Sequence, residues 1–126
     1  MVKEFPQTPV VLVVDDEALL RLAAVDVLED EGFATVSADC AEAALTELDA
    51  HPEVSVLFTD INMPGAFDGL ELARLVHIRR PEVQLILTSG RQPPARRDIP
   101  DDGAFLAKPY QGRAVADLIR AKVRYG

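Results

Sequence analysis

The sequence is poor in the residues that bind soft metals. It has one cysteine, Cys40, and two histidines, His51 and His77, in 126 residues. One cysteine allows no internal disulfide and no thiolate metal cluster, so a reducing compartment is the simplest assumption. The histidines lie far apart and lack zinc-site spacing, so both are interpreted as ordinary surface or boundary residues.

Positive charge and long apolar runs are also scarce. Lys and Arg number 13 against 21 Asp and Glu, a net charge of −8, and such a surface repels nucleic acid and anionic lipid. The basic pairs Arg79-Arg80 and Arg96-Arg97 are interpreted as solvated surface. The N-terminus MVKEFPQTP has no signal-peptide core, and no later stretch is long enough to span a membrane. We therefore expect a cytoplasmic protein without nucleic-acid or membrane partners.

No repeat, low-complexity run or linker interrupts the chain, and its length suits a single domain with one core. We predict an N-terminal tail over residues 1–8 and one domain over residues 9–126. The last predicted helix ends almost at Gly126, which leaves no room for an output domain.

Short apolar runs alternate with longer segments of helical period. The predicted strands are residues 10–14, 33–37, 54–59, 83–88 and 104–107. The first predicted helix ends at Gly32, and its apolar stripe consists of Leu20, Ala24, Val27 and Leu28.

Two helix starts carry an acid three residues before a Glu, an arrangement that satisfies free backbone amides. Asp39 with Glu42 is predicted to open the second helix, and Asp68 with Glu71 the third. The third helix should stop before Pro81, because proline excludes helical geometry from the preceding residue.

The fourth connection, RQPPARRDIPDDG, holds three prolines and is predicted to form only a short or irregular helix, and a last helix is predicted for residues 111–124. Five strand-helix repeats imply an α/β fold with a doubly wound parallel sheet, because parallel neighbours need a crossover. All strands of such a sheet end at one edge, where open α/β folds bind ligands.

Polar residues follow the predicted strands at this edge. Asp15 and Asp16 follow the first strand, Asp60 the third and Lys108 the fifth, while Thr88 closes the fourth. Taken alone, an acid between a strand and a helix is most often a helix N-cap. Together, three carboxylates, a hydroxyl and an amine at one edge predict a shared site.

Carboxylates about 4 Å apart repel by roughly 4 kcal/mol at an effective dielectric constant of about 20, so either one acid stays protonated or a cation lies between them. Mg²⁺ is the better answer, because it prefers oxygen ligands and assists phosphoryl transfer. The carboxylate of Asp60 is then a candidate nucleophile toward phosphorus. No Gly-rich phosphate loop is present, so the phosphate is predicted to be received rather than carried in on a bound nucleotide.

The motifs VVDDE, LFTDINMPGAFDGLELA, LILTSG and FLAKPY resemble those of response-regulator receiver domains, the phosphoacceptor half of two-component signalling. The likeness runs over residues 10–124. It implies a flavodoxin-like (βα)5 sheet of strand order 2-1-3-4-5. It also implies Mg²⁺ as cofactor, a sensor histidine kinase or histidine phosphotransferase as phosphodonor, an unknown downstream protein as target, and a monomer or weak dimer.

The resemblance also gives roles to the acidic residues. It implies that Asp60 is the phosphorylation site, that Asp16 binds Mg²⁺ directly and that Asp15 acts through water. The backbone carbonyl of Asn62 would complete the protein ligands.

Further roles implied by the resemblance lie on the fourth and fifth strands. Thr88 would bond a phosphoryl oxygen, and Lys108 would pair with the phosphoryl group. Phe105 stands at the position of the switch aromatic and would swing inward as Thr88 moves, although a plain core residue is the alternative. The Lys108-Pro109 peptide bond is expected to be cis. The loop MPGAFDG is one residue longer than the usual MPxMDG, so we expect it to be reshaped around Gly65.

The leading hypothesis is a phosphorylation switch, not an enzyme, whose only chemistry is Mg²⁺-dependent self-phosphorylation and self-dephosphorylation. A phosphate shuttle or sink, or a receiver cut from a hybrid histidine kinase, is the alternative within signalling. The enzyme alternative is a phosphohydrolase of the haloacid-dehalogenase kind. Those enzymes typically place a second Asp two residues after the first, where this chain has Asn62. An inert receiver-like module is the structural alternative.

Overall fold

The computed structural model describes residues 8–91, 93–100 and 103–125, with side chains through residue 123. These residues form a five-stranded parallel sheet of order β2-β1-β3-β4-β5. Its strands are β1 (Val10–Val14), β2 (Ala34–Ala38), β3 (Val54–Asp60), β4 (Gln84–Ser89) and β5 (Ala104–Ala107). The predicted fold class and strand order are confirmed. The tail predicted for residues 1–8 lies, apart from Thr8, outside the described residues.

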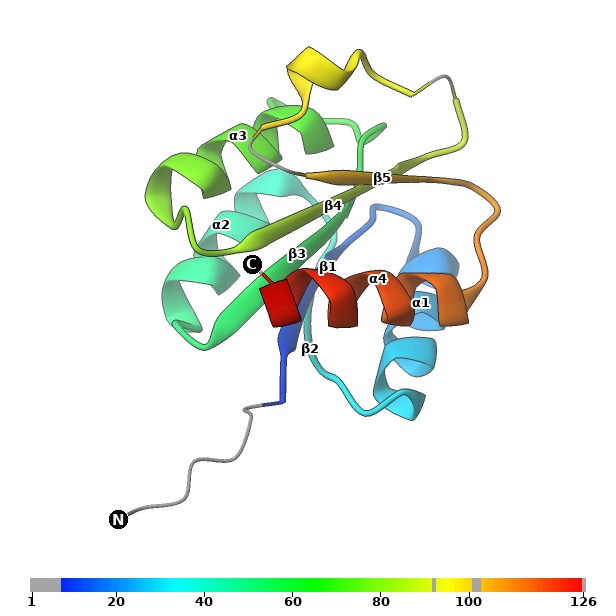
Figure 1. Ribbon diagram of the computed structural model, residues 1–126. Helices are drawn as coiled ribbons and strands as arrows, with labels where there is room; N and C mark the ends of the chain where they lie inside the picture. Colours follow the sequence, from blue (N-terminus) through cyan, green and yellow to red (C-terminus); the bar gives the residue numbers. More distant parts are fainter. Residues whose placement is uncertain (1–7, 92, 101–102, 126) are drawn as a thin grey trace.

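Helices cover both faces of the sheet (Figure 1). The α-helices are α1 (Ala18–Asp30), α2 (Ala41–Ala50), α3 (Gly69–Arg79) and α4 (Gly112–Tyr125). Figure 1 shows α2 and α3 together on one face, and α1 and α4 together on the other. None of the helices in the described part of the chain has the length and apolar content that a bilayer crossing requires.

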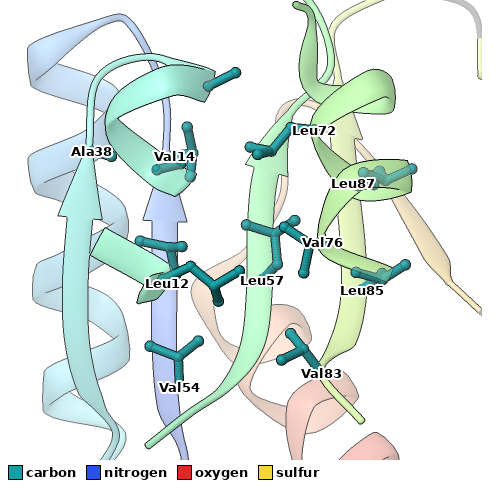
Figure 2. Close-up of a cluster of buried hydrophobic side chains, with 14 of the residues drawn as sticks. Leu12, Val14, Ala38, Val54, Leu57, Leu72, Val76, Val83, Leu85 and Leu87 are labelled. Carbon is teal, nitrogen blue, oxygen red and sulfur yellow. The ribbon is translucent and has the colours of Figure 1, made fainter. Parts of the chain in front are cut away.

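Two apolar clusters hold these layers together, one on each face of the sheet. Alternate residues of one strand face opposite sides, so Leu12 packs toward α2 and α3 while Val13 packs toward α1 and α4. Figure 2 shows the first cluster, in which strand side chains such as Leu57 and Leu87 meet α3. Because both faces are buried, the strands are almost continuously apolar.

The predicted helix starts have mixed outcomes. Asp68 is the N-cap of α3, as predicted, and its carboxylate accepts a hydrogen bond from the Glu71 N–H at 2.9 Å. The prediction for α2 was wrong by one residue, because Cys40 is its N-cap and the Cys40 Sγ accepts from the Ala43 N–H at 3.4 Å. The third helix ends at Arg79, before Pro81, as predicted.

The fourth connection has little helix, as its three prolines predicted. Of its described residues, only Arg96–Asp98 are helical, as the single 3-10 turn η1. Ile99 packs against the core beneath α3, whereas Ala95 is exposed. The edge strand β5 is therefore reached through a nearly irregular segment.

Arg80 is not the solvated surface residue that the sequence suggested. Its guanidinium donates hydrogen bonds to four backbone carbonyls at 2.7 to 3.2 Å, those of Leu48, His51, Pro52 and Val54. These carbonyls lie at the end of α2 and the start of β3. Arg80 thus ties the end of α3 to the preceding connection, while Arg96 and Arg97 are exposed as expected.

Candidate functional site

Asp60 is the last residue of β3 and lies at the carboxyl edge of the sheet. The strand is apolar and buried, and its ladder pairs Asp60 with Thr88 on β4. Asp60 is 6% exposed, and its Oδ1 accepts a hydrogen bond from the Asn62 N–H at 3.2 Å. The strand therefore fixes the carboxylate in a nearly buried position.

A glycine lets α3 start directly against Asp60. A Cβ atom added to Gly69 would overlap the Asp60 carbonyl oxygen, and the Gly69 N–H donates to the Ile61 carbonyl at 2.8 Å. Gly65, in the loop between Asp60 and Gly69, has a φ of 115°, a backbone conformation that favours glycine.

Asp15 and Asp16 lie in the loop between β1 and α1. Neither caps the helix, because Glu17 is the N-cap residue and α1 begins at Ala18. Instead, Asp15 Oδ1 accepts from the Glu17 N–H at 2.9 Å, and the Asp15 carbonyl accepts from the Arg21 guanidinium at 2.7 Å. Asp15 is 6% exposed, whereas Asp16 is exposed to solvent.

Lys108 joins the acids from the end of β5. Its Nζ lies 3.3 Å from Asp60 Oδ2 and 3.5 Å from Asp15 Oδ2. Its backbone N–H donates to the Ser89 carbonyl at 2.9 Å, and the following Lys108-Pro109 peptide bond is cis, as expected. The end of β5 therefore places the Lys108 ammonium group beside the carboxylates that follow β1 and end β3.

The charges of this cluster do not balance. Carboxylate oxygens of Asp15, Asp16 and Asp60 all lie within 4.8 Å of one another, whereas Lys108 contacts two of these carboxylates and Arg21 contacts only the Asp15 carbonyl. Burial raises the pKa of Asp60, although Lys108 partly opposes that shift. Burial lowers the pKa of Lys108, but the two nearby carboxylates outweigh it, so the pKa of the amine is raised. Oxygen ligands with excess negative charge suit a hard divalent cation such as Mg²⁺.

Thr88 presents an unused hydroxyl beside Asp60. The residue is 2% exposed, and its Oγ1 has no hydrogen-bond partner among the described residues. A buried polar atom of this kind is normally satisfied by a protein, water or ligand partner. Its position across the β3-β4 ladder from Asp60 makes it available to a group held by the carboxylate.

The remaining predicted residues lie around this cluster. The Asn62 side chain points to β4, where its Oδ1 accepts a hydrogen bond from the Ser89 hydroxyl. Phe105, on β5, is partly buried and packs against the cluster that α2 and α3 cover. Ser89 was missed in the sequence, although a second hydroxyl at the end of an apolar strand run is a detectable signal.

An apolar pocket of about 460 Å³ adjoins the acids on the side of α1 and α4. Lys108 lines it together with Tyr110, whose ring meets Phe58 edge-on at 5.4 Å between centroids. Burial raises the pKa of Tyr110. A Cβ atom on Gly112 would overlap Val27, so α4 starts in close contact with α1. No sequence pattern predicts this pocket.

The fold and the acidic cluster together define a doubly wound α/β protein with a metal-type site at the carboxyl edge of its sheet. The family model of the response regulator receiver domain matches residues 11–120, and the chain belongs to this family. It is a receiver domain of two-component signalling.

Named relatives and solved structures agree. The response regulator protein FleR of Pseudomonas aeruginosa is 38% identical over 114 residues, which cover 86% of this chain and 23% of that protein. The sensor kinase CckA of Brucella abortus is 30% identical over 114 residues, 87% of this chain and 12% of that protein. The chain thus spans less than a quarter of the length of either relative. The crystal structure of a response regulator receiver protein from Pseudomonas putida has a TM-score of 0.81 and 30% identity, covering 93% of this chain and 99% of that one.

Proposed function

We propose that Asp60 is the phosphoacceptor of this receiver domain. The observation that carries the proposal is the convergence of Asp15, Asp16 and Lys108 on Asp60, with the unpartnered Thr88 hydroxyl across the ladder. An Asp60 carboxylate oxygen attacks the phosphorus of a phosphohistidine, a P–O bond forms, and the P–N bond to the histidine breaks. The products are an aspartyl phosphate and the free histidine of the donor.

The residues around Asp60 fit distinct parts of this transfer. Lys108, which already contacts both buried acids, pairs with the phosphoryl oxygens, and the Thr88 hydroxyl donates to one of them. Phe105 is then free to move inward with Thr88.

Mg²⁺ is the proposed cofactor, held by Asp16, Asp60 and the backbone carbonyl of Asn62. Asp15 would act on it through water, since one of its oxygens accepts from the Glu17 N–H and the other faces Lys108. When bound, Mg²⁺ offsets the negative charge of the carboxylates and of the incoming phosphoryl group.

The proposed phosphodonor is a sensor histidine kinase or histidine phosphotransferase, and the phosphorylated surface switches the binding of a downstream protein. We propose no chemistry beyond acquisition and loss of the phosphoryl group. Water releases it by attacking phosphorus, which regenerates the Asp60 carboxylate and inorganic phosphate. A phosphohydrolase of the haloacid-dehalogenase kind typically has an Asp two residues after its nucleophile, whereas this position holds Asn62, whose carboxamide is hydrogen-bonded to Ser89. We therefore expect no turnover of a phosphate monoester.

Intact-mass measurement tests the site. The protein is incubated with Mg²⁺ and acetyl phosphate, and wild type is compared with Asp60→Asn. Asp26→Asn, which changes an exposed acid on α1, is the matched control. We expect a phosphoryl adduct on wild type and on Asp26→Asn, and none on Asp60→Asn. When EDTA is added before the donor, no adduct should form on any of the three proteins. An adduct that survives in Asp60→Asn would contradict the assignment.

A phosphate shuttle or sink is the competing function for the same Asp60 chemistry. A switch must change conformation when Asp60 is phosphorylated, whereas a sink needs no such change. Amide NMR spectra with and without beryllofluoride separate the two. Shifts that reach Phe105 and β5 support a switch, and shifts confined to the neighbours of Asp60 support a sink.

A further inference from the structure

Ser89 connects three parts of the rim around Asp60. It is the last residue of β4 and is 1% exposed. Its hydroxyl oxygen accepts a hydrogen bond from the Arg91 N–H at 3.0 Å. Because an N–H can only donate, the hydroxyl proton remains for the Asn62 Oδ1, to which the Ser89 hydroxyl donates a hydrogen bond. The Ser89 carbonyl accepts from the Lys108 N–H at 2.9 Å.

The link to Asn62 reaches the phosphoacceptor through very few atoms. The Asn62 backbone N–H is the donor to Asp60 Oδ1, and the following N–H, of Met63, donates to the Ile61 carbonyl at 3.2 Å. Asn62 as a whole is exposed, whereas its neighbours Ile61 and Met63 are buried, so burial holds the flanking residues and not the Asn62 side chain. The bond to Ser89 therefore restrains the residue whose N–H contacts Asp60.

The link to Arg91 matters because of the irregular fourth connection. In that connection the described residues form only the turn η1, so no regular helix begins at the end of β4. The Ser89 hydroxyl holds the first part of this segment through the Arg91 N–H and, with the same oxygen, holds the loop after β3. One buried hydroxyl thus joins the two loops that border the acids.

We propose that Ser89 is a positioning residue for the metal site, acting through the side chain of Asn62. By fixing the Asn62 carboxamide, it keeps the Asn62 N–H on Asp60 and keeps the Asn62 backbone carbonyl available to Mg²⁺. This inference rests on the proposed function, because the Asn62 carbonyl is a ligand only if the acids hold the metal.

Calorimetric titration with Mg²⁺ alone, without a phosphodonor, tests the proposal. The variants are Ser89→Ala, Asn62→Ala and the double variant. Ser55→Ala is the matched control, because the buried Ser55 hydroxyl of β3 has no partner among the described residues. We expect Ser89→Ala to weaken Mg²⁺ binding roughly tenfold, the usual loss when a residue that orients a ligand is removed. Asn62→Ala should weaken Mg²⁺ binding by the same factor, and the double variant should be no weaker than either single variant. Ser55→Ala should bind Mg²⁺ as tightly as wild type.

Thermal unfolding in metal-free buffer separates positioning from a general loss of structure. Ser89→Ala should unfold within a few degrees of wild type, since it removes one oxygen and leaves the strand intact. Asn62 is exposed, so Asn62→Ala provides the same test if Ser89→Ala fails to fold.

Unchanged Mg²⁺ affinity in Ser89→Ala or in Asn62→Ala would overturn the proposal. Losses that add in the double variant would overturn the route through Asn62. The phosphoryl adduct of wild type reports on the proposed function independently. If wild type forms the adduct and binds Mg²⁺ while Ser89→Ala binds it equally well, only this inference fails. If wild type does not bind Mg²⁺, the metal site and this inference fail together.

Discussion

Two connections leave the rim beside Asp60, and they return to the sheet in different ways. The connection after β3 contains α3, which is capped by Asp68, buries Leu72 and Val76, and ends in a guanidinium that binds four carbonyls. In the connection after β4, the described residues form the single turn η1, which has no buried residue. Both connections nevertheless follow strands whose last residues lie at the same site.

The difference teaches that the strands, and not the helices, place the reactive groups. Thr88 and Ser89 lie on β4 and are nearly inaccessible, although the described residues between β4 and β5 include only the turn η1. The three prolines of this connection disfavour a longer helix, because proline lacks the N–H that an interior helical residue donates. The rim keeps its geometry there through the β3-β4 ladder and the Ser89 hydroxyl.

The largest expected contrast is in stability, between one arginine from each of the two connections. Arg80→Ala should lower the free energy of unfolding by about 3 kcal/mol, because a charged donor loses several partly buried carbonyl partners. Arg96→Ala, in the exposed turn η1, should change it by less than about 0.5 kcal/mol. Urea denaturation measures both. Equal effects would mean that the carbonyl contacts of Arg80 contribute nothing to stability.

The second contrast uses a glycine from each connection. Gly69→Ala should cost about 2 kcal/mol and reduce phosphorylation of Asp60, because the added methyl group overlaps the Asp60 main chain. Gly90→Ala should be neutral or slightly stabilising, because its Cβ would meet no atom within 4 Å. Denaturation and the adduct assay check these outcomes. Normal phosphorylation of Gly69→Ala would show that α3 can shift away from β3 without displacing the Asp60 carboxylate.

The third contrast concerns helix capping. Asp68→Ala should cost about 1 kcal/mol through loss of the bond to the Glu71 N–H, whereas Asp68→Asn should cost only a few tenths, since its carbonyl also caps. Asp98→Ala, in η1, is the comparison and should change stability by less than about 0.5 kcal/mol. Thermal unfolding resolves the order. A loss in Asp98→Ala as large as in Asp68→Ala would give the fourth connection a stability that its structure does not explain.

The smallest contrast is in the pH dependence of stability, between Asp60 at the end of β3 and Thr88 at the end of β4. It is small because Lys108 opposes part of the rise that burial causes in the Asp60 pKa. Burial raises the Asp60 pKa above 3.8, so the folded protein holds this proton more tightly than the unfolded chain. Stability therefore falls as pH rises from the ordinary pKa through the raised one. Without Mg²⁺, Asp60→Asn should be more stable than wild type at pH 7.

Urea denaturation between pH 3 and 8 measures how this advantage changes. It should shrink as the pH falls toward the ordinary pKa of Asp60. Thr88→Ala, which removes no titratable group, should differ from wild type by a constant amount over the same range. An advantage of Asp60→Asn that is independent of pH would contradict a raised pKa.

The sequence sufficed for features that depend on local pattern and on the direction of strands. Asp15, Asp60 and Lys108 could be brought together in advance, because parallel strands end at one edge and apolar runs mark where each strand stops. The cap of α2 was missed by one residue, because Asp39 and Cys40 differ in backbone placement rather than in pattern.

Contacts between remote segments were beyond sequence reasoning. The Ser89-Asn62 bond joins residues 27 positions apart, and Arg80 reaches carbonyls 26 to 32 positions away. Both depend on the register of neighbouring strands and on where a helix stops. The pocket beside Tyr110 similarly requires knowing how closely Gly112 lets α4 approach α1.

Arg80 has a consequence for how this chain can diverge. Its guanidinium recognises only main-chain oxygens, so Leu48, His51, Pro52 and Val54 can be replaced without removing its acceptors. Natural variants should therefore retain arginine at position 80 whatever side chains the acceptor positions carry, while Leu48 and Val54 are constrained by the core and not by Arg80. Covariation between positions, which usually reveals residues in contact, would therefore not detect the contacts between Arg80 and these four residues.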